Sequence, residues 1–257
     1  MQPEINFAGI SLKTFGLMFA LTFLAIGILL ARRLRELGKP TDWAYEMTFV
    51  ALGGGLVGSR LYFVVQNYSS VKHDLLGNLF GGSGLVWYGG VIGGAIAIVA
   101  WAAYRGMLGL VLLDLCAAPL ALGYAIGRGG CQISGDGDYG KAWDGPWAMA
   151  YPHGVVPTTE RVHPTPIYET LAMGIAAIVL WRLRNRFRPG VLFALYLVFA
   201  GTERLLVEFL RRNAHVLAGL TAPQLESIGL LVAGAIWLTV ARRRGGWAPA
   251  AAAVQRR

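Results

Sequence analysis

The sequence predicts an all-α membrane protein that crosses the bilayer about seven times. Hydrophobic residues make up 55% of the 257 residues and charged residues only 14%, whereas soluble domains carry about 25% charge. The mean hydropathy is +0.52, and apolar stretches close to the ~20 residues of a membrane-spanning helix recur along the chain. This composition excludes a disordered chain and a disulfide-rich secreted module, and it argues against a water-soluble enzyme.

Seven apolar stretches mark the expected helices. In chain order they cover residues 11–31, 44–66, 85–104, 107–127, 166–183, 189–208 and 223–241. The first is too long for the apolar core of a signal peptide, and its basic residues follow rather than precede it. We therefore expect a single transmembrane domain over residues 1–257. The segment at about 128–165 exceeds the ~12–15 residues of an ordinary loop, so we expect it to be an outer functional segment.

The basic residues predict the orientation. The net charge of +9 would also fit a nucleic-acid-binding protein, but the Lys and Arg residues gather just outside apolar stretches. There they mark cytoplasmic loops. With the N-terminus outside, the segments after the first, third, fifth and seventh stretches hold most of the 23 basic residues. We therefore expect an outer N-terminus, a cytoplasmic C-terminus and no nucleic-acid partner.

Cysteine and glycine positions carry structural rather than chemical information. Cys116 and Cys131 would lie roughly 20 Å apart along one continuous helix, which excludes a disulfide between them. With two cysteines and four histidines in the chain, no metal site is expected, and Asp136 with Asp138 is only a weak indication of a cation. The four-residue spacing of glycines in residues 89–94 is typical of closely packed membrane helices.

Charged residues inside apolar stretches indicate function, because the bilayer makes them costly. Those that lie near the outer ends of their stretches are Arg60, Arg128, Glu169, Glu203, Arg204 and Glu208, followed by Arg211 and Arg212. Scattered structural ion pairs would not be expected to share one depth. Glu46 and Asp114 lie at other depths, and we interpret both as structural.

Arg204, Glu208 and Arg211 have the spacing of residues on one helix face. They fit either a salt-bridge ladder that reaches the headgroups or a guanidinium held by a carboxylate to face a phosphate. Arginine suits the second role because its planar fork binds phosphate oxygens bidentately. Arg60 and Arg128 would add donors from other helices.

Two further segments hold candidate residues. Residues 127–140 contain six glycines, which let backbone approach a ligand closely; they follow a membrane helix, so no dinucleotide-binding loop is inferred. His163 precedes Pro164 and Pro166, which favour a new helix start. A structural and a catalytic role for His163 are equally supported.

These motifs resemble those of the prolipoprotein diacylglyceryl transferase family over nearly the whole chain. GRGGCQISGD at 127–136 resembles the family's Gly-Arg-x-Gly-Asn-Phe-x-Asn-x-Glu, with Cys131 and Ser134 in place of asparagines and Asp136 in place of glutamate. HPTPIYE at 163–169 matches His-Pro-(Ser/Thr)-x-x-Tyr-Glu, and RLLVEFLR at 204–211 matches Arg-x-x-x-Glu-Phe-x-Arg. Tyr88 departs from the family's His-Gly-Gly, and a tyrosine with a pKa near 10 is a poorer base than a histidine near 6.5.

The resemblance implies transfer of a diacylglyceryl group from phosphatidylglycerol to the lipobox cysteine of a prolipoprotein signal peptide, with release of glycerol phosphate. It implies no cofactor or metal, and a multi-pass enzyme of the bacterial inner membrane whose active site faces the outer leaflet. The catalytic candidates are Tyr88, Arg128, Asp136, His163, Arg204 and Glu208. The substrate-binding candidates are Arg60, Gly89, Gly90, Gly135, Tyr168, Glu169 and Arg211.

By this resemblance Arg128 and Arg204 would bind the lipid phosphate, and Glu208 would orient Arg204. Tyr88 would hydrogen-bond the phosphate or the thiol, and Asp136 or His163 would be the base. A related transferase with a different acceptor is the alternative. A lipid transporter is disfavoured because the inner halves of the third, fifth and seventh stretches are almost purely apolar, and an intramembrane protease because no Gly-x-Ser-x-Gly occurs.

Overall fold

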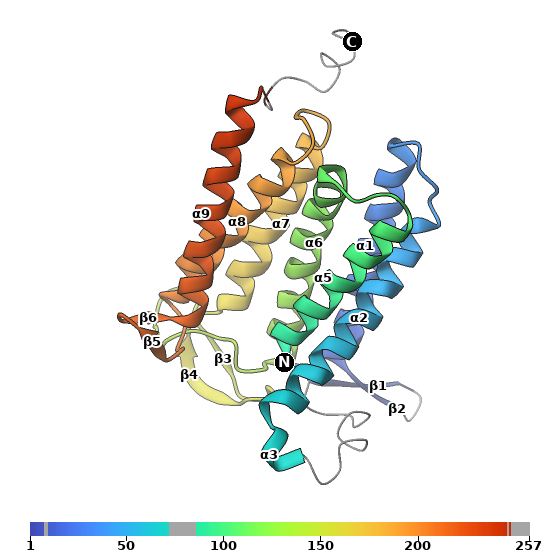
Figure 1. Cartoon of the computed structure of the whole chain (residues 1–257). Helices are drawn as coiled ribbons and strands as arrows, with labels where there is room; N and C mark the ends of the chain where they lie inside the picture. Colours follow the sequence, from blue (N-terminus) through green and yellow to red (C-terminus); the bar gives the residue numbers. More distant parts are fainter. Residues whose placement is uncertain (8–9, 72–85, 246, 248–257) are drawn as a thin grey trace, which may run out of the picture. The chain divides into compact units, whose positions relative to one another are not determined.

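The computed structural model describes residues 1–7, 10–71, 86–245 and 247, and it is mostly helical (Figure 1). The long helices are α1 (Thr14–Glu36), α2 (Trp43–Gln66), α5 (Trp87–Tyr104), α6 (Leu110–Ser134), α7 (Thr165–Leu183), α8 (Val191–Glu208) and α9 (Ala222–Arg243). A short helix, α3 (Tyr68–Val71), follows α2. Each long helix coincides with one of the predicted apolar stretches, apart from differences at the ends.

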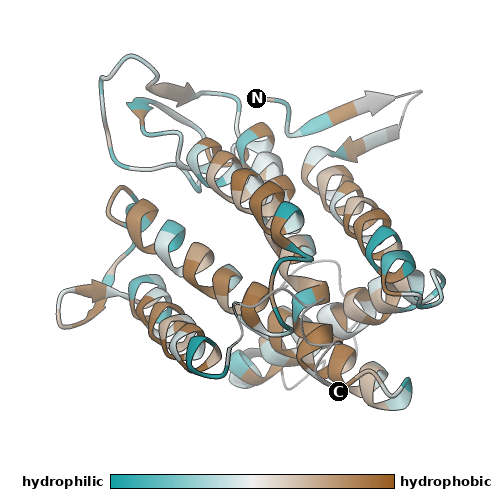
Figure 2. Ribbon diagram, turned by 90° about the horizontal axis from the view of Figure 1, so that it is seen from above, coloured by the Kyte–Doolittle hydropathy of each residue, from teal (hydrophilic) through white to brown (hydrophobic). Residues whose placement is uncertain are grey.

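The apolar surface of these helices supports a multi-pass membrane protein. Within the described residues, six helices are long and apolar enough to cross a membrane, namely α1, α2, α5, α6, α7 and α9. Helix α8 has 18 residues, and Glu203, Arg204 and Glu208 place three charges within them. Figure 2 shows apolar residues over most of the helix surfaces and hydrophilic residues mainly at helix ends and in loops. The count of seven crossings and the orientation remain predictions.

Three antiparallel hairpins, which the sequence did not predict, lie at helix ends (Figure 1). Their strands are β1 (Glu4–Phe7) with β2 (Ile10–Lys13), β3 (Met149–Tyr151) with β4 (Thr158–Val162), and β5 (His215–Leu217) with β6 (Leu220–Thr221). The first apolar stretch therefore begins as a strand. The other two hairpins occupy the chain between α6 and α7 and between α8 and α9.

The described chain divides into two compact units. Unit 1 comprises Met1–Ile26 and Leu113–Arg257, and unit 2 comprises Gly27–Leu112, so the boundaries pass through α1 and α6. In unit 1, α8 packs against both α7 and α9. Helix α6 is continuous between Cys116 and Cys131, and both cysteines are free, as expected.

Unit 2 is built on close contact between α2 and α5. A Cβ atom added at Gly58 would lie 2.7 Å from Gly93 Cα, and one added at Gly93 would lie 2.8 Å from Gly58 Cα. A Cβ at Gly89 would meet the Gly58 carbonyl, and one at Gly90 would lie 3.6 Å from the Gly55 carbonyl oxygen. These glycines therefore permit helix packing, as their spacing predicted.

The two acidic residues that we interpreted as structural have structural partners. Glu46 accepts a hydrogen bond from Trp101 Nε1 at 2.8 Å and forms an ion pair with Arg105. Asp114 accepts the backbone N–H groups of Gly190 and Phe193, each at 2.8 Å, at the start of α8. A carboxylate suits this position, because the first N–H groups of a helix lack partners within the helix.

Candidate functional site

Arg128 lies inside α6, because the helix continues to Ser134. This corrects the expectation that the outer segment begins at Arg128: the chain leaves the helix only at Gly135. Gly130 allows α1 to pack closely against α6, since a Cβ at Gly130 would lie 3.0 Å from Met18 Cβ. Arg128 is therefore held by regular helical backbone, which fixes its direction better than a loop would.

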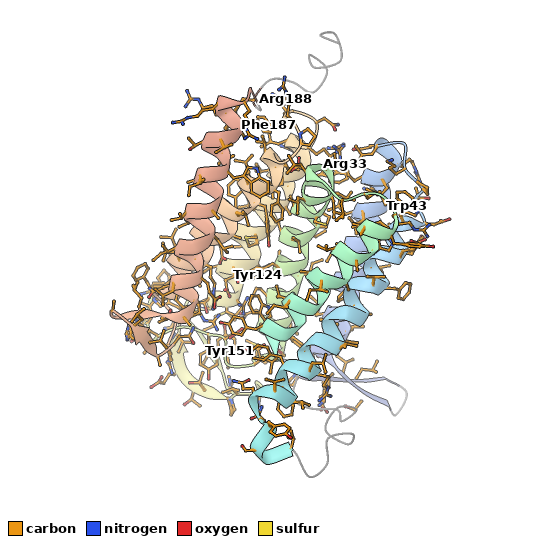
Figure 3. The ribbon with its side chains drawn as sticks, in the orientation of Figure 1. Arg33, Trp43, Tyr124, Tyr151, Phe187 and Arg188 are labelled. Atoms are coloured by element: carbon orange, nitrogen blue, oxygen red, sulfur yellow. The ribbon has the colours of Figure 1, made fainter. Side chains whose placement is uncertain are left out.

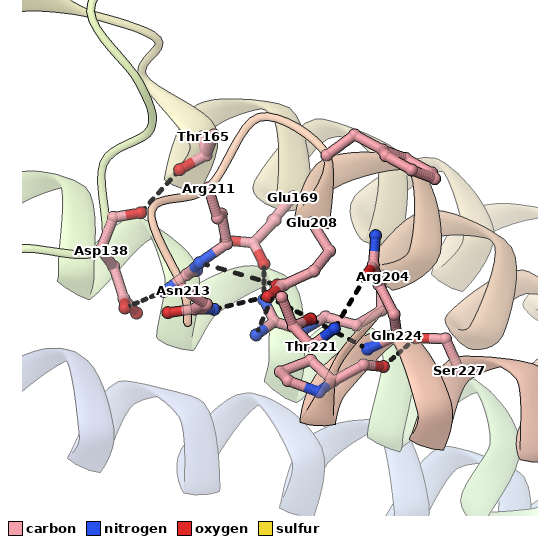
Figure 4. A network of polar contacts seen from close by, with 12 residues as sticks. Asp138, Thr165, Glu169, Arg204, Glu208, Arg211, Asn213, Thr221, Gln224 and Ser227 are labelled. Carbon is pink, nitrogen blue, oxygen red and sulfur yellow. Dashed lines mark hydrogen bonds and ion pairs between the residues drawn. The ribbon is translucent and has the colours of Figure 1, made fainter. Parts of the chain in front are cut away.

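A single carboxylate contacts three arginines of unit 1, of which Figure 4 labels Arg204 and Arg211. The Glu169 side chain, near the start of α7, is fully buried. Its oxygens lie 3.2 Å from Arg128 Nε, 2.9 Å from Arg204 Nη1 and 3.6 Å from Arg211 Nη1. We call Glu169 and these three arginines the arginine cluster. Its members come from α6, α7, α8 and the chain after α8, so the fold assembles it.

Arg211 reaches the cluster from a turn. Helix α8 ends at Glu208, and the Arg211 N–H donates to the Glu208 carbonyl at 3.1 Å. The expected helix face shared by Arg204, Glu208 and Arg211 is therefore wrong for Arg211. The three side chains still meet, because the turn directs the Arg211 side chain back toward Glu208 Oε2, 4.0 Å from Arg211 Nε.

Asp138 also contacts the arginine cluster, whereas in the sequence it was, together with Asp136, only a weak indication of a cation. Arg128 and Arg211 both form ion pairs with its carboxylate, and its carbonyl accepts the Thr165 hydroxyl at 2.6 Å. Gly135 and Gly137, with φ of +62° and +95°, turn the chain after α6 in a way that favours glycine. Burial raises the pKa of Asp138, but the two arginines outweigh burial and hold it below the ordinary value.

Glu208 connects the cluster to the β5–β6 hairpin and α9. Its Oε1 accepts hydrogen bonds from Asn213 at 2.6 Å and from Thr221 at 2.8 Å, and its Oε2 lies 3.3 Å from Arg204 Nη2. Thr221 and Gln224 form a capping box at the start of α9. Glu208 is therefore a fixed partner of Arg204, which fits an orienting role.

Several buried atoms of this region lack hydrogen-bond partners within the described residues. They are Glu169 Oε2, Glu203 Oε1, Glu208 Oε2 and Arg211 Nη1. Glu203 is 8% exposed and belongs to the same end of α8 as Arg204. Glu169 Oε2, Glu208 Oε2 and Arg211 Nη1 are nevertheless in ion pairs at 3.2–4.0 Å. The cluster is therefore held by charge contacts that are longer than ordinary hydrogen bonds.

Three neighbours of the cluster could be found only from the structure. Tyr124, labelled on α6 in Figure 3, donates to Glu169 Oε1 at 2.9 Å, and the Arg128 guanidinium lies 5.1 Å from the centroid of its ring. In the sequence the four-residue spacing to Arg128 is the only signal. Asn213 and Thr221 give no signal, because their contact with Glu208 depends on the hairpin.

Asp136 and Gly135 lie beside the cluster. Asp136 Oδ1 accepts the Asp138 N–H at 3.3 Å, and polar atoms of Cys131, Asp136 and Asp138 lie within 4.8 Å of one another. Asp138 is already neutralised by two arginines, which disfavours a cation there. A Cβ at Gly135 would lie 2.7 Å from Gly154 Cα, so this glycine serves backbone packing.

His163 and Tyr168 belong to an aromatic group. The His163 ring stacks on Trp143 with centroids 4.3 Å apart, and its Nδ1 lies 3.3 Å from the Tyr168 hydroxyl. That hydroxyl accepts Trp147 Nε1 at 2.7 Å. Burial lowers the pKa of His163, which favours the neutral imidazole.

The remaining candidates, Arg60, Tyr88, Gly89 and Gly90, lie in unit 2. Arg60 is on α2, and the others are in the first turn of α5. The Tyr88 ring centroid is 6.5 Å from that of Tyr62 and 5.2 Å from that of Trp87. Their roles therefore remain predictions separate from the arginine cluster.

Comparisons with known proteins agree with these motifs. The family model for prolipoprotein diacylglyceryl transferase matches residues 4–240. The phosphatidylglycerol–prolipoprotein diacylglyceryl transferase of Clostridium tetani is 30% identical over 95% of this chain and 99% of its own length. The enzymes of the same name from Methylobacillus flagellatus and Leptospira interrogans are 32% and 30% identical, over 93% and 84% of this chain and 95% and 76% of their own lengths. The resemblance inferred from the motifs is confirmed: this chain belongs to the prolipoprotein diacylglyceryl transferase family.

Proposed function

We propose that this protein transfers the diacylglyceryl group of phosphatidylglycerol to the lipobox cysteine of prolipoprotein signal peptides. The relatives carry the name of this activity. The observation that carries the proposal is the meeting of Arg128, Arg204 and Arg211 around buried Glu169. Such a group of guanidiniums suits an anionic phosphate in a membrane protein.

The reaction exchanges one bond at a glyceryl carbon. The cysteine thiolate attacks the diacylglyceryl carbon next to the phosphate oxygen, a carbon–sulfur bond forms, and the carbon–oxygen bond breaks. The bonding electrons go to the phosphate oxygen, so glycerol phosphate leaves. The thiol proton goes to a base, because the thiolate is the nucleophilic form.

The arginines would act mainly on the leaving group. As the carbon–oxygen bond breaks, the charge on the phosphate rises from about −1 to about −2. Donors aimed at a developing charge stabilise the transition state more than the ground state. Arg128 and Arg204 would bind this phosphate, with Arg204 oriented by its contacts to Glu169 and Glu208 at 2.9 and 3.3 Å.

His163 is the base that we favour. Asp138 is held ionised by two arginines, so it is a weak proton acceptor. The oxygens of Glu208 are already occupied by two hydrogen bonds and an ion pair with Arg204. The lowered pKa of His163 keeps its imidazole neutral near pH 7. Asp136 and Tyr88 are the other candidates, and a pH profile separates His163 from them.

The proposed topology includes all seven long helices. Although α8 holds three charges, its buried Glu203 and Glu208 lie toward the protein rather than toward lipid. We propose one transmembrane domain in the bacterial inner membrane, with an outer N-terminus, a cytoplasmic C-terminus, and the cluster near the outer leaflet. The segment between α6 and α7 would then be the outer functional segment. Both proposed substrates reach this depth from the membrane.

The test is transfer to a synthetic lipobox peptide. The full chain in phosphatidylglycerol vesicles should add one diacylglyceryl mass to the peptide and release an equal amount of glycerol phosphate, also in the presence of a chelator. A peptide with serine in place of cysteine is the control. Release of glycerol phosphate with an unmodified peptide would favour a different acceptor, and the absence of both products would refute the proposal.

A further inference from the structure

A pocket of about 240 Å³ lies next to the arginine cluster within unit 1. Its lining comes from Lys141, the chain just after α8, the β5–β6 hairpin and the first turn of α9. The side chains of Lys141, Arg212 and His215 are exposed at its rim, whereas Glu208 and Arg211 are buried.

Arg211 belongs to both the cluster and the pocket. Its side chain is 9% exposed and forms an ion pair with Asp138 through Nη2. Its Nη1 is buried, makes no hydrogen bond with the described residues, and lies 3.6 Å from Glu169 Oε2. Within the described residues Nη1 therefore has one long ion-pair contact and no hydrogen bond, and the Arg211 guanidinium lies at the boundary between the cluster and the pocket.

The electrostatics of the pocket favour an anion. Lys141, Arg211 and Arg212 are positive, although Arg212 also forms an ion pair with Glu160 at 2.9 Å. The charge of Glu208 is compensated by hydrogen bonds from Asn213 and Thr221 and by Arg204. Lys141 Nζ donates to the Phe209 carbonyl at 2.9 Å. An ammonium group has three donors, so Lys141 retains donors for a ligand.

We infer that this pocket binds a small phosphate monoester and is the route by which glycerol phosphate leaves the site. The inference rests on the proposed function, which produces this monoester next to Arg211. Above its second pKa, near 6, the product carries two negative charges, so it cannot leave through lipid. The pocket volume of about 240 Å³ equals roughly eight water molecules, which suits ten non-hydrogen atoms joined by covalent bonds.

The test is binding of radiolabelled glycerol phosphate to the full chain in detergent, measured by equilibrium dialysis. Lys141→Gln should weaken binding about fivefold, as expected for loss of an exposed charge-assisted contact, and Lys141→Arg should restore it. Lys13→Gln, at an exposed position on β2 of the same unit, is the matched control and should bind like the wild type. Equal binding by Lys141→Gln and the wild type would overturn the inference.

A second measurement distinguishes the free product from the lipid headgroup. If the pocket serves the product, Lys141→Gln should leave the apparent KM for phosphatidylglycerol within about twofold while it weakens glycerol phosphate binding. A raised KM with unchanged glycerol phosphate binding would assign the pocket to the headgroup and overturn the inference. Lys141-dependent binding by a protein without transfer activity would support the monoester site and refute the proposed function alone.

Discussion

Each unit of the molecule contains a polar group among apolar helices, and the two groups differ in how completely they are satisfied. In unit 2, Glu46 meets one arginine, Arg105, and the indole of Trp101, and the side chains of the ion pair are about one-third exposed. In unit 1, the fully buried Glu169 meets three arginines, and buried oxygen and nitrogen atoms remain without hydrogen bonds. An ion pair with a single arginine is typical of a structural contact. Three guanidinium groups gathered around one carboxylate offer many N–H donors, which suits the binding of an anionic ligand.

The largest expected effect is on catalysis by the unit 1 cluster. Arg128→Gln should lower kcat/KM for peptide modification about 10³-fold, because removing one donor to a developing oxyanion costs this much. The thermal midpoint should also fall, because Arg128 is a partner of the buried Glu169 and of Asp138, so rates are compared at a temperature at which both proteins are folded. The measurement is initial rates by peptide mass together with a melting curve. A rate within tenfold of the wild type would contradict the proposed role of Arg128 in binding the phosphate.

Glu169→Gln should have the largest effect on stability. The substitution removes the buried charge shared by the arginines, and loss of one partner of a buried pair costs about 3–5 kcal/mol. Chemical denaturation in detergent measures the change. Glu46→Gln in unit 2 is the matched control and should destabilise the protein much less, because its ion pair is partly exposed to solvent. Equal losses of unfolding free energy in the two variants would show that the burial of Glu169 does not make its ion pairs more important for stability than those of Glu46.

The pH dependence of transfer tests His163. Because the pKa of His163 is lowered from 6.5, the neutral base is present at higher pH and is lost as pH falls through a midpoint below 6.5. His163→Gln should lower kcat at least about 10²-fold and remove this acidic limb. A limb that persists in the variant would assign the base to another group.

Glu203→Gln should have a small effect. Its Oε1 makes no hydrogen bond within the described residues, so a neutral amide should change stability by about 1 kcal/mol or less. We expect the transfer rate to stay within about tenfold, because Glu203 forms no ion pair with the arginines in the described chain. A loss as large as that of Arg128→Gln would move Glu203 into the group that contacts substrate.

The smallest expected effect is at the unit 2 pair. Arg105→Gln removes an ion pair whose side chains are about one-third exposed. Such pairs contribute little to stability, and transfer should stay within twofold. The same assay and melting curve check it. A collapse of transfer with an unchanged melting curve would contradict the structural role of this pair.

The helices were largely predictable, because membrane spans are signalled by runs of apolar residues. The predicted stretch 189–208 corresponds to α8, which covers Val191–Glu208. The predicted stretch 107–127 corresponds to α6, which begins at Leu110 and continues through several glycines to Ser134. The hairpins were not predicted, since β1 and β2 are only four residues each and depend on pairing. Local apolar content therefore predicts spans but not short paired strands.

The members of the cluster were partly predictable for a similar reason. Arg128, Glu169 and Arg204 are unusual in apolar stretches, so their cost alone identifies them. The choice of Asp138 over Asp136 as ion-pair partner depends on the positive φ angles at Gly135 and Gly137. A sequence shows that glycines permit such angles but does not show which carboxylate they direct inward.

The most direct test compares two arginine-to-lysine substitutions in one transfer assay. Lysine keeps the charge but loses the planar fork that contacts several oxygens. Arg128→Lys should reduce modification of the lipobox peptide at least about 10²-fold, while Arg105→Lys stays within twofold of the wild type. Equal rates for the two variants would contradict the proposal that the arginine cluster of unit 1 binds the phosphate during transfer.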